Sequence, residues 1–182
     1  MPDSITFMIP LAIALPLVSA ILLFVLGSRS QTWMRGLSIL GFLGPLLITL
    51  WIAVEFYSNE IPGNVYQGIS STDTGLSFFG ISLTLGLNAI SMPLFLLAGI
   101  VGAAAGLYAY YSHAARMHIY LALLLFMLAG LLGTFASVDL FFFYFFHEFA
   151  LIPTFVMIGI WGGQGRRVAA IEMTIYLTLG AM

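Results

Sequence analysis

One glutamate, Glu148, stands in the middle of a long apolar run and is the residue best placed to do chemistry. With a helical rise of about 1.5 Å per residue, Glu148 lies roughly 13 Å beyond Asp139, and roughly 20 Å remain to Trp161. That depth is near the middle of a bilayer, where a charge costs about 2.5 kcal/mol or more, so such residues usually face a bundle interior or a water-filled path. A carboxyl held there can take up and release a proton as its surroundings change. The pattern predicts proton transfer at Glu148.

Three neighbours of Glu148 could assist it. Tyr144 lies one turn earlier on the same helical face and could donate a hydrogen bond to the carboxyl. His147 offers a second titratable group, although adjacent helical residues point about 100° apart. Pro153 leaves the carbonyl of Phe149 without its helical donor, which loosens the helix and could admit water. The alternatives are a protonated Glu148 used only for packing and a neutral His147 bonded to a neighbouring helix.

Two further carboxylates have less distinctive settings. Asp139 precedes the apolar run and is expected to cap the N-terminus of a helix. Glu172 lies roughly 7 Å beyond Arg167 along the next helix. It could pair with Arg167 or with another helix, or it could mark the mouth of a proton path.

The elements that position these residues are long apolar blocks. Charged residues make up 7% of the chain, whereas soluble domains carry about a quarter. Each block is close to or above the roughly 20 residues that span a bilayer. The blocks are Ile5–Leu26, Trp33–Tyr57, Asn88–Tyr111, Met117–Ala136 and Leu140–Trp161. We expect an all-α fold: one polytopic transmembrane helical bundle over residues 1–182, with about five full helices and the start of a sixth, cut within that sixth helix.

The longest connection, residues 58–87, is expected to hold a short strand or hairpin. It opens with a cluster of turn-forming residues, Ser58–Asn64. Apolar and polar residues then alternate over Ile81–Leu85, which is the period of a half-buried strand.

The arginines predict the orientation. The chain has no lysine, and its arginines all fall in alternate connections: Arg29, Arg35, Arg116, Arg166 and Arg167. Short loops rich in Lys and Arg stay on the cytoplasmic side. We therefore expect the N-terminus outside and the arginine-bearing loops inside.

Small residues predict close helix packing. Gly99, Gly102 and Gly106 lie in the third block, with a Gly-xxx-Gly spacing at 102 and 106, and Ala129 and Gly133 repeat that spacing in the fourth. Such motifs let helix backbones approach in lipid. They indicate a polytopic bundle and nothing more specific.

Cysteine is absent, which excludes disulfides, thiolate-bound iron–sulfur clusters and covalently attached c-type haem in this segment. We predict no metal site and no cofactor-binding residue in this chain. The expected surroundings are the lipid bilayer and other membrane subunits, with no role in nucleic-acid binding.

Three segments carry a resemblance to a known family. DLFFFYFFHEFALIPTFVMIGIWGG, from Asp139 to Gly163, resembles the fifth helix of the M-type antiporter-like membrane subunit of respiratory complex I (NADH:quinone oxidoreductase; chain M or subunit 4). AAIEMTIYLTLGAM, from Ala169, resembles the start of that family's sixth helix, and LGLNAISMPL, from Leu85, resembles the entry to its third. The resemblance covers essentially the whole chain, which would be an N-terminal fragment.

The resemblance implies a role for Glu148. That residue matches the family's intramembrane glutamate, which takes part in proton translocation with a lysine on a later helix. Family members bind no redox cofactor, so NADH, FMN, iron–sulfur clusters and quinone are expected on other subunits. The resemblance also implies antiporter-like neighbours of the L and N type and a bacterial inner membrane with a periplasmic N-terminus. Many relatives carry lysine where this chain has Glu172, and Asp-Gly where it has Asn88-Ala89, so no family role passes to these positions.

The leading hypothesis is a proton-translocating membrane-arm subunit of NADH:quinone oxidoreductase, that is, a non-redox subunit of an enzyme that couples electron transfer to proton pumping. A subunit of a related multi-subunit Na⁺/H⁺ antiporter or of a membrane-bound hydrogenase is the alternative. A structural membrane subunit that transports nothing is a third hypothesis, which predicts that Glu148 can be replaced by Gln without consequence.

Overall fold

The computed structural model describes residues 2–27, 30–58, 65–72, 81–112 and 114–181. Within these ranges the helices are α1 (Pro2–Leu26), α2 (Gln31–Ser58), α3 (Ser91–Tyr111), α4 (Met117–Ala136), α5 (Leu140–Trp161) and α6 (Arg166–Ala181). The strands are β1 (Gln67–Thr72) and β2 (Leu83–Leu87). Five of the described helices, α1 to α5, are long and apolar enough to cross a membrane, and α6 has 16 residues. The prediction of a polytopic all-α membrane fold is confirmed.

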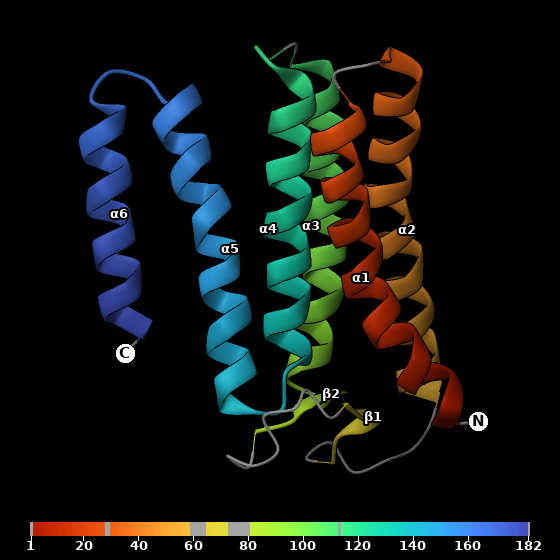
Figure 1. Cartoon of the computed structure of the whole chain (residues 1–182). Coiled ribbons are helices and arrows are strands. Elements are labelled where there is room, and N and C mark those ends of the chain that lie inside the picture. Colours follow the sequence, from red (N-terminus) through yellow and green to blue (C-terminus); the bar gives the residue numbers. More distant parts are fainter. Residues whose placement is uncertain (1, 28–29, 59–64, 73–80, 113, 182) are drawn as a thin grey trace.

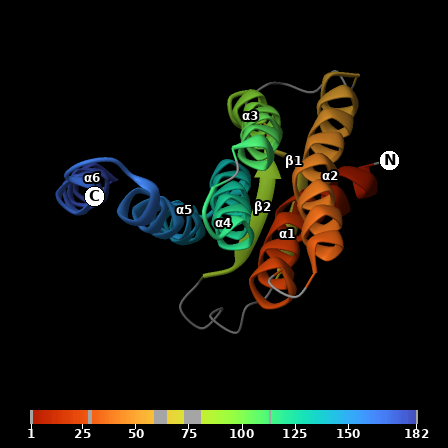
Figure 2. The same cartoon turned by 90° about the horizontal axis from the view of Figure 1, so that it is seen from above.

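The helices run up and down, with α1 to α4 gathered into a cluster and α5 and α6 standing to one side (Figures 1 and 2). The helix α4 joins these parts, because it packs against α1 and α3 on one side and against α5 on the other. Leu121, Leu125 and Leu132 of α4 are fully buried, as are Ile9 of α1 and Phe95 of α3. The α5 helix contacts α4 and α6.

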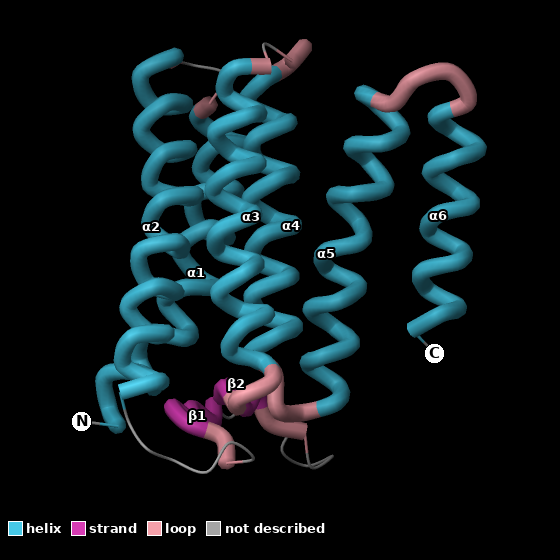
Figure 3. The backbone as a smooth tube through the Cα atoms, turned by 180° about the vertical axis from the view of Figure 1, so that it is seen from behind, coloured by secondary structure: helices cyan, strands magenta, loops and turns pink. Residues whose placement is uncertain are grey.

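A two-stranded hairpin covers the end of the cluster at which α1 begins (Figure 3). The described arginines lie at the opposite end, at the starts of α2, α4 and α6. The strands β1 and β2 pair antiparallel, with Thr72 opposite Leu83 and Gln67 opposite Leu87. The expected strand was Ile81–Leu85, so its prediction was correct in kind and early by two residues at each end. Most of the turn-former cluster, residues 59–64, lies outside the described part of the chain.

Glycines set the closest helix contacts, but not in the pairs that their spacing indicates. A Cβ added to Gly102 would collide with Leu128 of α4, whereas one added to Gly106 would collide with Phe42 of α2. The Gly-xxx-Gly pair therefore serves two different neighbours. In α4, the residues that admit α5 are Gly130, which faces Ala150, and Gly133, which faces Phe146.

The contact between Gly130 and Ala150 leads to a stability prediction. A Cβ at position 130 would lie 2.8 Å from both the Cβ and the backbone nitrogen of Ala150, so Gly130→Ala must push α5 away from α4. Overpacking of this kind typically costs about 1–3 kcal/mol. We expect a lower apparent melting temperature in detergent micelles. Gly159→Ala, on α5 where no described residue apart from the adjacent backbone of α5 comes within 4 Å of the added Cβ, is the matched control and should not lower the melting temperature. Equal effects of the two substitutions would contradict close packing at Gly130.

Candidate proton-transfer site

The start of α5 is fixed by a side-chain cap and by the hairpin. The carboxylate of Asp139 accepts hydrogen bonds from the backbone N–H groups of Phe141 (2.8 Å) and Phe142 (3.3 Å), which confirms the predicted N-cap. The preceding residue, Val138, donates its backbone N–H to the Thr84 carbonyl of β2 at 2.9 Å. The hairpin thereby holds the point at which α5 begins.

The other end of α5 is held by Trp161. Its indole Nε1–H donates to the carbonyl of Ala115 at 2.9 Å, in the connection between α3 and α4. The indole also packs edge-on against the Tyr120 ring, with 5.1 Å between ring centroids. Its position at the end of an apolar block favours a membrane interface for Trp161. No local sequence pattern indicates that Trp161 would bond to the α3–α4 connection.

The middle of α5 contacts α4 through both polar and aromatic groups. The Thr154 hydroxyl lies 3.4 Å from the sulfur of Met127 and donates to the Ala150 carbonyl at 2.9 Å. The rings of Phe126 and Phe149 meet edge-on, with 5.6 Å between centroids. Sequence reasoning missed Thr154, because a threonine in an apolar run carries no signal of what it touches. The helix continues through Pro153, which is buried.

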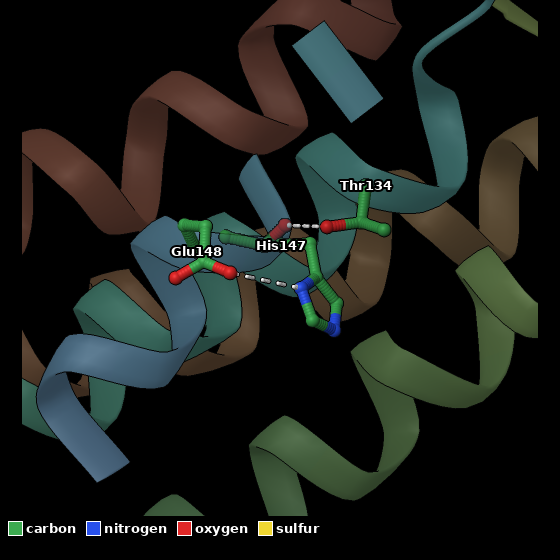
Figure 4. A network of polar contacts seen from close by, with 4 residues as sticks. Thr134, His147 and Glu148 are labelled. Atoms are coloured by element: carbon green, nitrogen blue, oxygen red, sulfur yellow. Dashed lines mark hydrogen bonds and ion pairs between the residues drawn. The ribbon is translucent and has the colours of Figure 1, made fainter. Parts of the chain in front are cut away.

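Glu148 and His147 lie side by side near the middle of α5 (Figure 4). Glu148 Oε1 is 3.9 Å from His147 Nδ1, and the two side chains are 33% and 30% exposed. Both of these atoms are buried, and neither has a hydrogen-bond partner in the described chain. Although successive helical residues diverge by about 100°, the two side chains turn toward each other. The structure therefore brings together the carboxyl and the imidazole of the expected site.

Tyr144 completes this cluster on α5. Its ring stacks on the His147 ring, with 6.4 Å between centroids and an interplanar angle of 30°. The Tyr144 phenol also interacts electrostatically with the Glu148 carboxyl. On the facing helix α4, the Thr134 hydroxyl donates to the carbonyl of Gly130 at 2.8 Å, within its own helix (Figure 4). Tyr144, His147 and Glu148 are called the α5 cluster below.

The face of α5 that carries Glu148 is apolar and uncovered by the described residues. Positions spaced four and three residues apart share one helical face. Those around Glu148 are Phe141, Phe145, Ile152 and Phe155, and each is at least 40% exposed. A carboxyl that faces hydrocarbon is costly in free energy. Glu148 therefore needs a polar or charged group beside it on this face.

Glu172 lies apart from the α5 cluster in its interactions. It is exposed on α6, and in the described part of the chain it forms no ion pair, with Arg167 or with any other residue. The guanidinium of the neighbouring Arg166 instead donates to the Ile160 carbonyl at 2.9 Å. Pairing of Glu172 with Arg167 is therefore not found. Within the described ranges, no group of three or more His, Cys, Asp or Glu residues could hold a metal ion.

No family model matches the chain, but individual relatives match almost all of it. It is 29% identical to subunit M of the F(420)H(2) dehydrogenase of Methanosarcina mazei over 96% of its length. It is 31% identical to NAD(P)H-quinone oxidoreductase chain 4 of Gloeobacter violaceus over 93%, and 27% identical to NADH-quinone oxidoreductase subunit M of Pseudomonas aeruginosa over 85%. These matches cover 35%, 31% and 31% of the relatives, so the chain spans about a third of their length.

Solved structures agree with the sequence matches. A chain of respiratory complex I from Thermus thermophilus superposes with a TM-score of 0.76 at 28% identity, over 96% of this chain and 33% of that one. A chain of an archaeal membrane-bound sulfane sulfur reductase shares the fold, with a TM-score of 0.73 at 21% identity, over 94% of this chain and 25% of that one. The predicted resemblance to the M-type (chain 4) antiporter-like membrane subunits of quinone oxidoreductases is thus confirmed over nearly the whole chain.

Proposed function

We propose that this chain is part of a proton-translocating membrane-arm subunit of a complex I-type quinone oxidoreductase, in which Glu148 carries the proton. The observation that carries the proposal is the state of the Glu148 carboxyl. It lies inside a bilayer-length helix, with Oε1 buried, without a hydrogen-bond partner and 3.9 Å from an equally unpartnered His147 Nδ1. A proton can pass between two such groups when a small side-chain movement brings them to hydrogen-bond length or when one water bridges them.

The mechanism that we propose is a change of charge next to Glu148. A cation brought near the carboxyl favours its charged form and releases the proton, and withdrawal of the cation lets the carboxyl take up another. His147 Nδ1, 3.9 Å away, would receive or supply the proton, and Tyr144 would stabilise the arrangement through its contacts with both residues. Pro153 would allow water to reach the helix beside the carboxyl.

The partner cation is proposed to come from outside these 182 residues. The uncovered face around Glu148 supports this proposal, because a carboxyl on an apolar face needs a polar or charged partner. The relatives are about three times as long as this chain, so they contain further segments that could supply that partner. A lysine on a later helix, as the family resemblance implies, would occupy that position. Glu172 is proposed only as a secondary group in the proton path.

The rest of the enzyme follows as part of the proposal. The subunit itself would carry no redox group, and the electron donor, FMN, iron–sulfur clusters and quinone would be held by other subunits, next to antiporter-like neighbours of the L and N type. Relatives are named after NADH, NAD(P)H and F(420)H(2), so the donor is left open between these. We propose that the N-terminus faces outward from the plasma membrane, since the four described arginines lie at the opposite end of the bundle.

The second candidate is a subunit of a related ion-translocating respiratory complex, such as a membrane-bound hydrogenase or a multi-subunit Na⁺/H⁺ antiporter. The fold shared with the archaeal sulfane sulfur reductase chain favours keeping it. The α5 cluster would serve proton transfer in either assembly, and only the coupling reaction would differ.

Replacing the carboxyl tests its role. Glu148→Gln keeps the size and hydrogen-bonding capacity of the side chain but removes the titratable proton. We expect proton uptake by inverted vesicles during quinone reduction to fall about a hundredfold or more, the usual contribution of a positioned acid–base group, while the complex assembles normally. The matched control is Asp139→Asn, which removes a carboxylate from the same helix but keeps the oxygen that caps it.

The outcomes separate the hypotheses. Unchanged pumping in Glu148→Gln with normal assembly would leave Glu148 a packing residue and would sink the proposal. Normal quinone reduction with a loss of Na⁺-driven proton exchange would favour the antiporter alternative instead.

The other members of the α5 cluster should have smaller effects. His147→Asn removes the titrating ring next to Glu148 Oε1, and Tyr144→Phe removes the hydroxyl while keeping the ring that stacks on His147. We expect His147→Asn to slow pumping less than about tenfold, an effect of about 1.4 kcal/mol or less, and to alter its pH dependence. Tyr144→Phe should also slow pumping less than about tenfold, because His147 and Glu148 stay in place. A wild-type pH profile in His147→Asn would show that the imidazole has only a packing role.

A further inference from the structure

A cavity with both polar and apolar walls lies between the start of α2, the end of α3 and the start of α4. Figure 1 shows that these three helix ends meet at one end of the bundle. Its volume is about 450 Å³, and its walls include Gln31, Met34, Arg35, Tyr110 and Met117. This end lies opposite the hairpin and the α5 cluster is not among its walls. Any ligand of this cavity would therefore be separate from the proposed proton carrier.

Arg35 is the charged residue among the described walls of the cavity. The Arg35 side chain is exposed, and its guanidinium lies 6.0 Å from the centre of the Tyr110 ring. Within the described ranges, no carboxylate pairs with Arg35. The carboxylates of Glu55 and Asp139 belong to the hairpin end of their helices, and Glu148 lies in the middle of α5. A guanidinium without an anionic partner beside tyrosine side chains suits a phosphate group.

An apolar groove continues from this cavity along the bundle. The groove lies between α2 and α3 and has a volume of about 220 Å³. It shares Tyr110 and Tyr111 with the cavity at Arg35. Its walls include Ile39, Leu43 and Leu107. Ser38 also lines the groove, and its hydroxyl donates to the carbonyl of Arg35 at 2.9 Å within α2. The recess at Arg35 thus adjoins a largely apolar groove.

We propose that this composite site binds an anionic phospholipid, with its phosphate at Arg35 and one acyl chain in the α2–α3 groove. Basic recesses between transmembrane helices suit acidic lipid headgroups, and tyrosines are favoured at the depth of the interface. The bilayer supplies such a ligand at this level of the protein. This inference goes beyond the proposed function and does not depend on it.

Two other recesses show what sets this one apart. The groove between α3 and α4, about 210 Å³ and lined by residues such as Leu97, Leu124 and Phe135, holds no charged residue. The recess at the α5–α6 connection contains Arg166 and Arg167 but no aromatic residue. The α2–α3 site combines a cation, aromatic rings and an adjoining apolar groove.

The test uses the assembled, detergent-purified complex after delipidation. Its thermal unfolding is followed while phosphatidylglycerol, phosphatidylcholine or inorganic phosphate is titrated in. We expect phosphatidylglycerol to stabilise the wild type at lower concentration than phosphatidylcholine. Arg35→Gln should raise the midpoint of the phosphatidylglycerol titration roughly fivefold, the factor that corresponds to about 1 kcal/mol for one basic residue. Arg167→Gln, at the same end but outside the site, is the control and should keep the wild-type midpoint.

A second variant tests the groove and is independent of Arg35. Leu107→Trp adds bulk at an exposed position in the groove wall and should raise the phosphatidylglycerol midpoint while Arg35 stays in place. If Arg35→Gln reduces assembly, Leu107→Trp and Arg35→Lys, which keeps the charge, still provide the comparison. The proposal is overturned if both Arg35→Gln and Leu107→Trp titrate like the wild type. It is also overturned if phosphatidylcholine or inorganic phosphate stabilises the complex as well as phosphatidylglycerol does, or if no lipid stabilises it because protein covers the groove.

Discussion

The high free energy of a carboxylate in hydrocarbon is the main physical constraint on this structure. A charge at the centre of a bilayer costs about 2.5 kcal/mol or more, so a glutamate persists there only with a proton, a cation or water. Glu148 lies well inside a helix of bilayer length, and the described chain supplies no hydrogen bond to its buried Oε1. His147 Nδ1 lies 3.9 Å from Oε1, within ion-pair range if the imidazole is protonated but beyond hydrogen-bond length. In the proposed mechanism, the charge state of Glu148 therefore depends on which charged or polar groups approach its carboxyl.

The anchoring of α5 explains how such a group is kept in place. One end is tied to the hairpin through Asp139 and Val138, and the other end is tied to the α3–α4 connection through Trp161. Between them, Gly130 lets α4 approach Ala150 closely. These contacts fix the side of α5 that faces α4 and leave the opposite, Glu148-bearing face open. In the proposed mechanism, a charged group approaches Glu148 on this open face while the contacts at both ends of α5 stay in place.

Sequence patterns predicted the helices well because bilayer thickness imposes a length on every apolar block. The bounds of α4 and α5 match the predicted blocks, and the cap at Asp139 follows from its local chemistry. Helix neighbours were not predictable in the same way, because these helices are apolar all round and spacing alone does not select a partner. The divergent partners of Gly102 and Gly106 show this.

The candidate site was predicted in part. Glu148 stands out in any apolar run, and Tyr144 follows from helical periodicity. The approach of His147 to Glu148 depends on side-chain rotation, which residue spacing does not determine. The links made by Thr154 and Trp161 depend on which residues of α4 and of the α3–α4 connection lie opposite them. Such contacts arise from tertiary packing, and no local pattern in the sequence records them.

The most direct test of the account is to observe the protonation of Glu148 during turnover. Infrared difference spectra of the complex, recorded between resting and energised states, would detect a carboxyl that gains or loses a proton, and the Glu148→Gln variant would assign the band. The account predicts a carboxylic-acid band that changes with turnover in the wild type and is missing in the variant. A wild-type spectrum in which no band assigned to Glu148 changes during pumping would contradict the account.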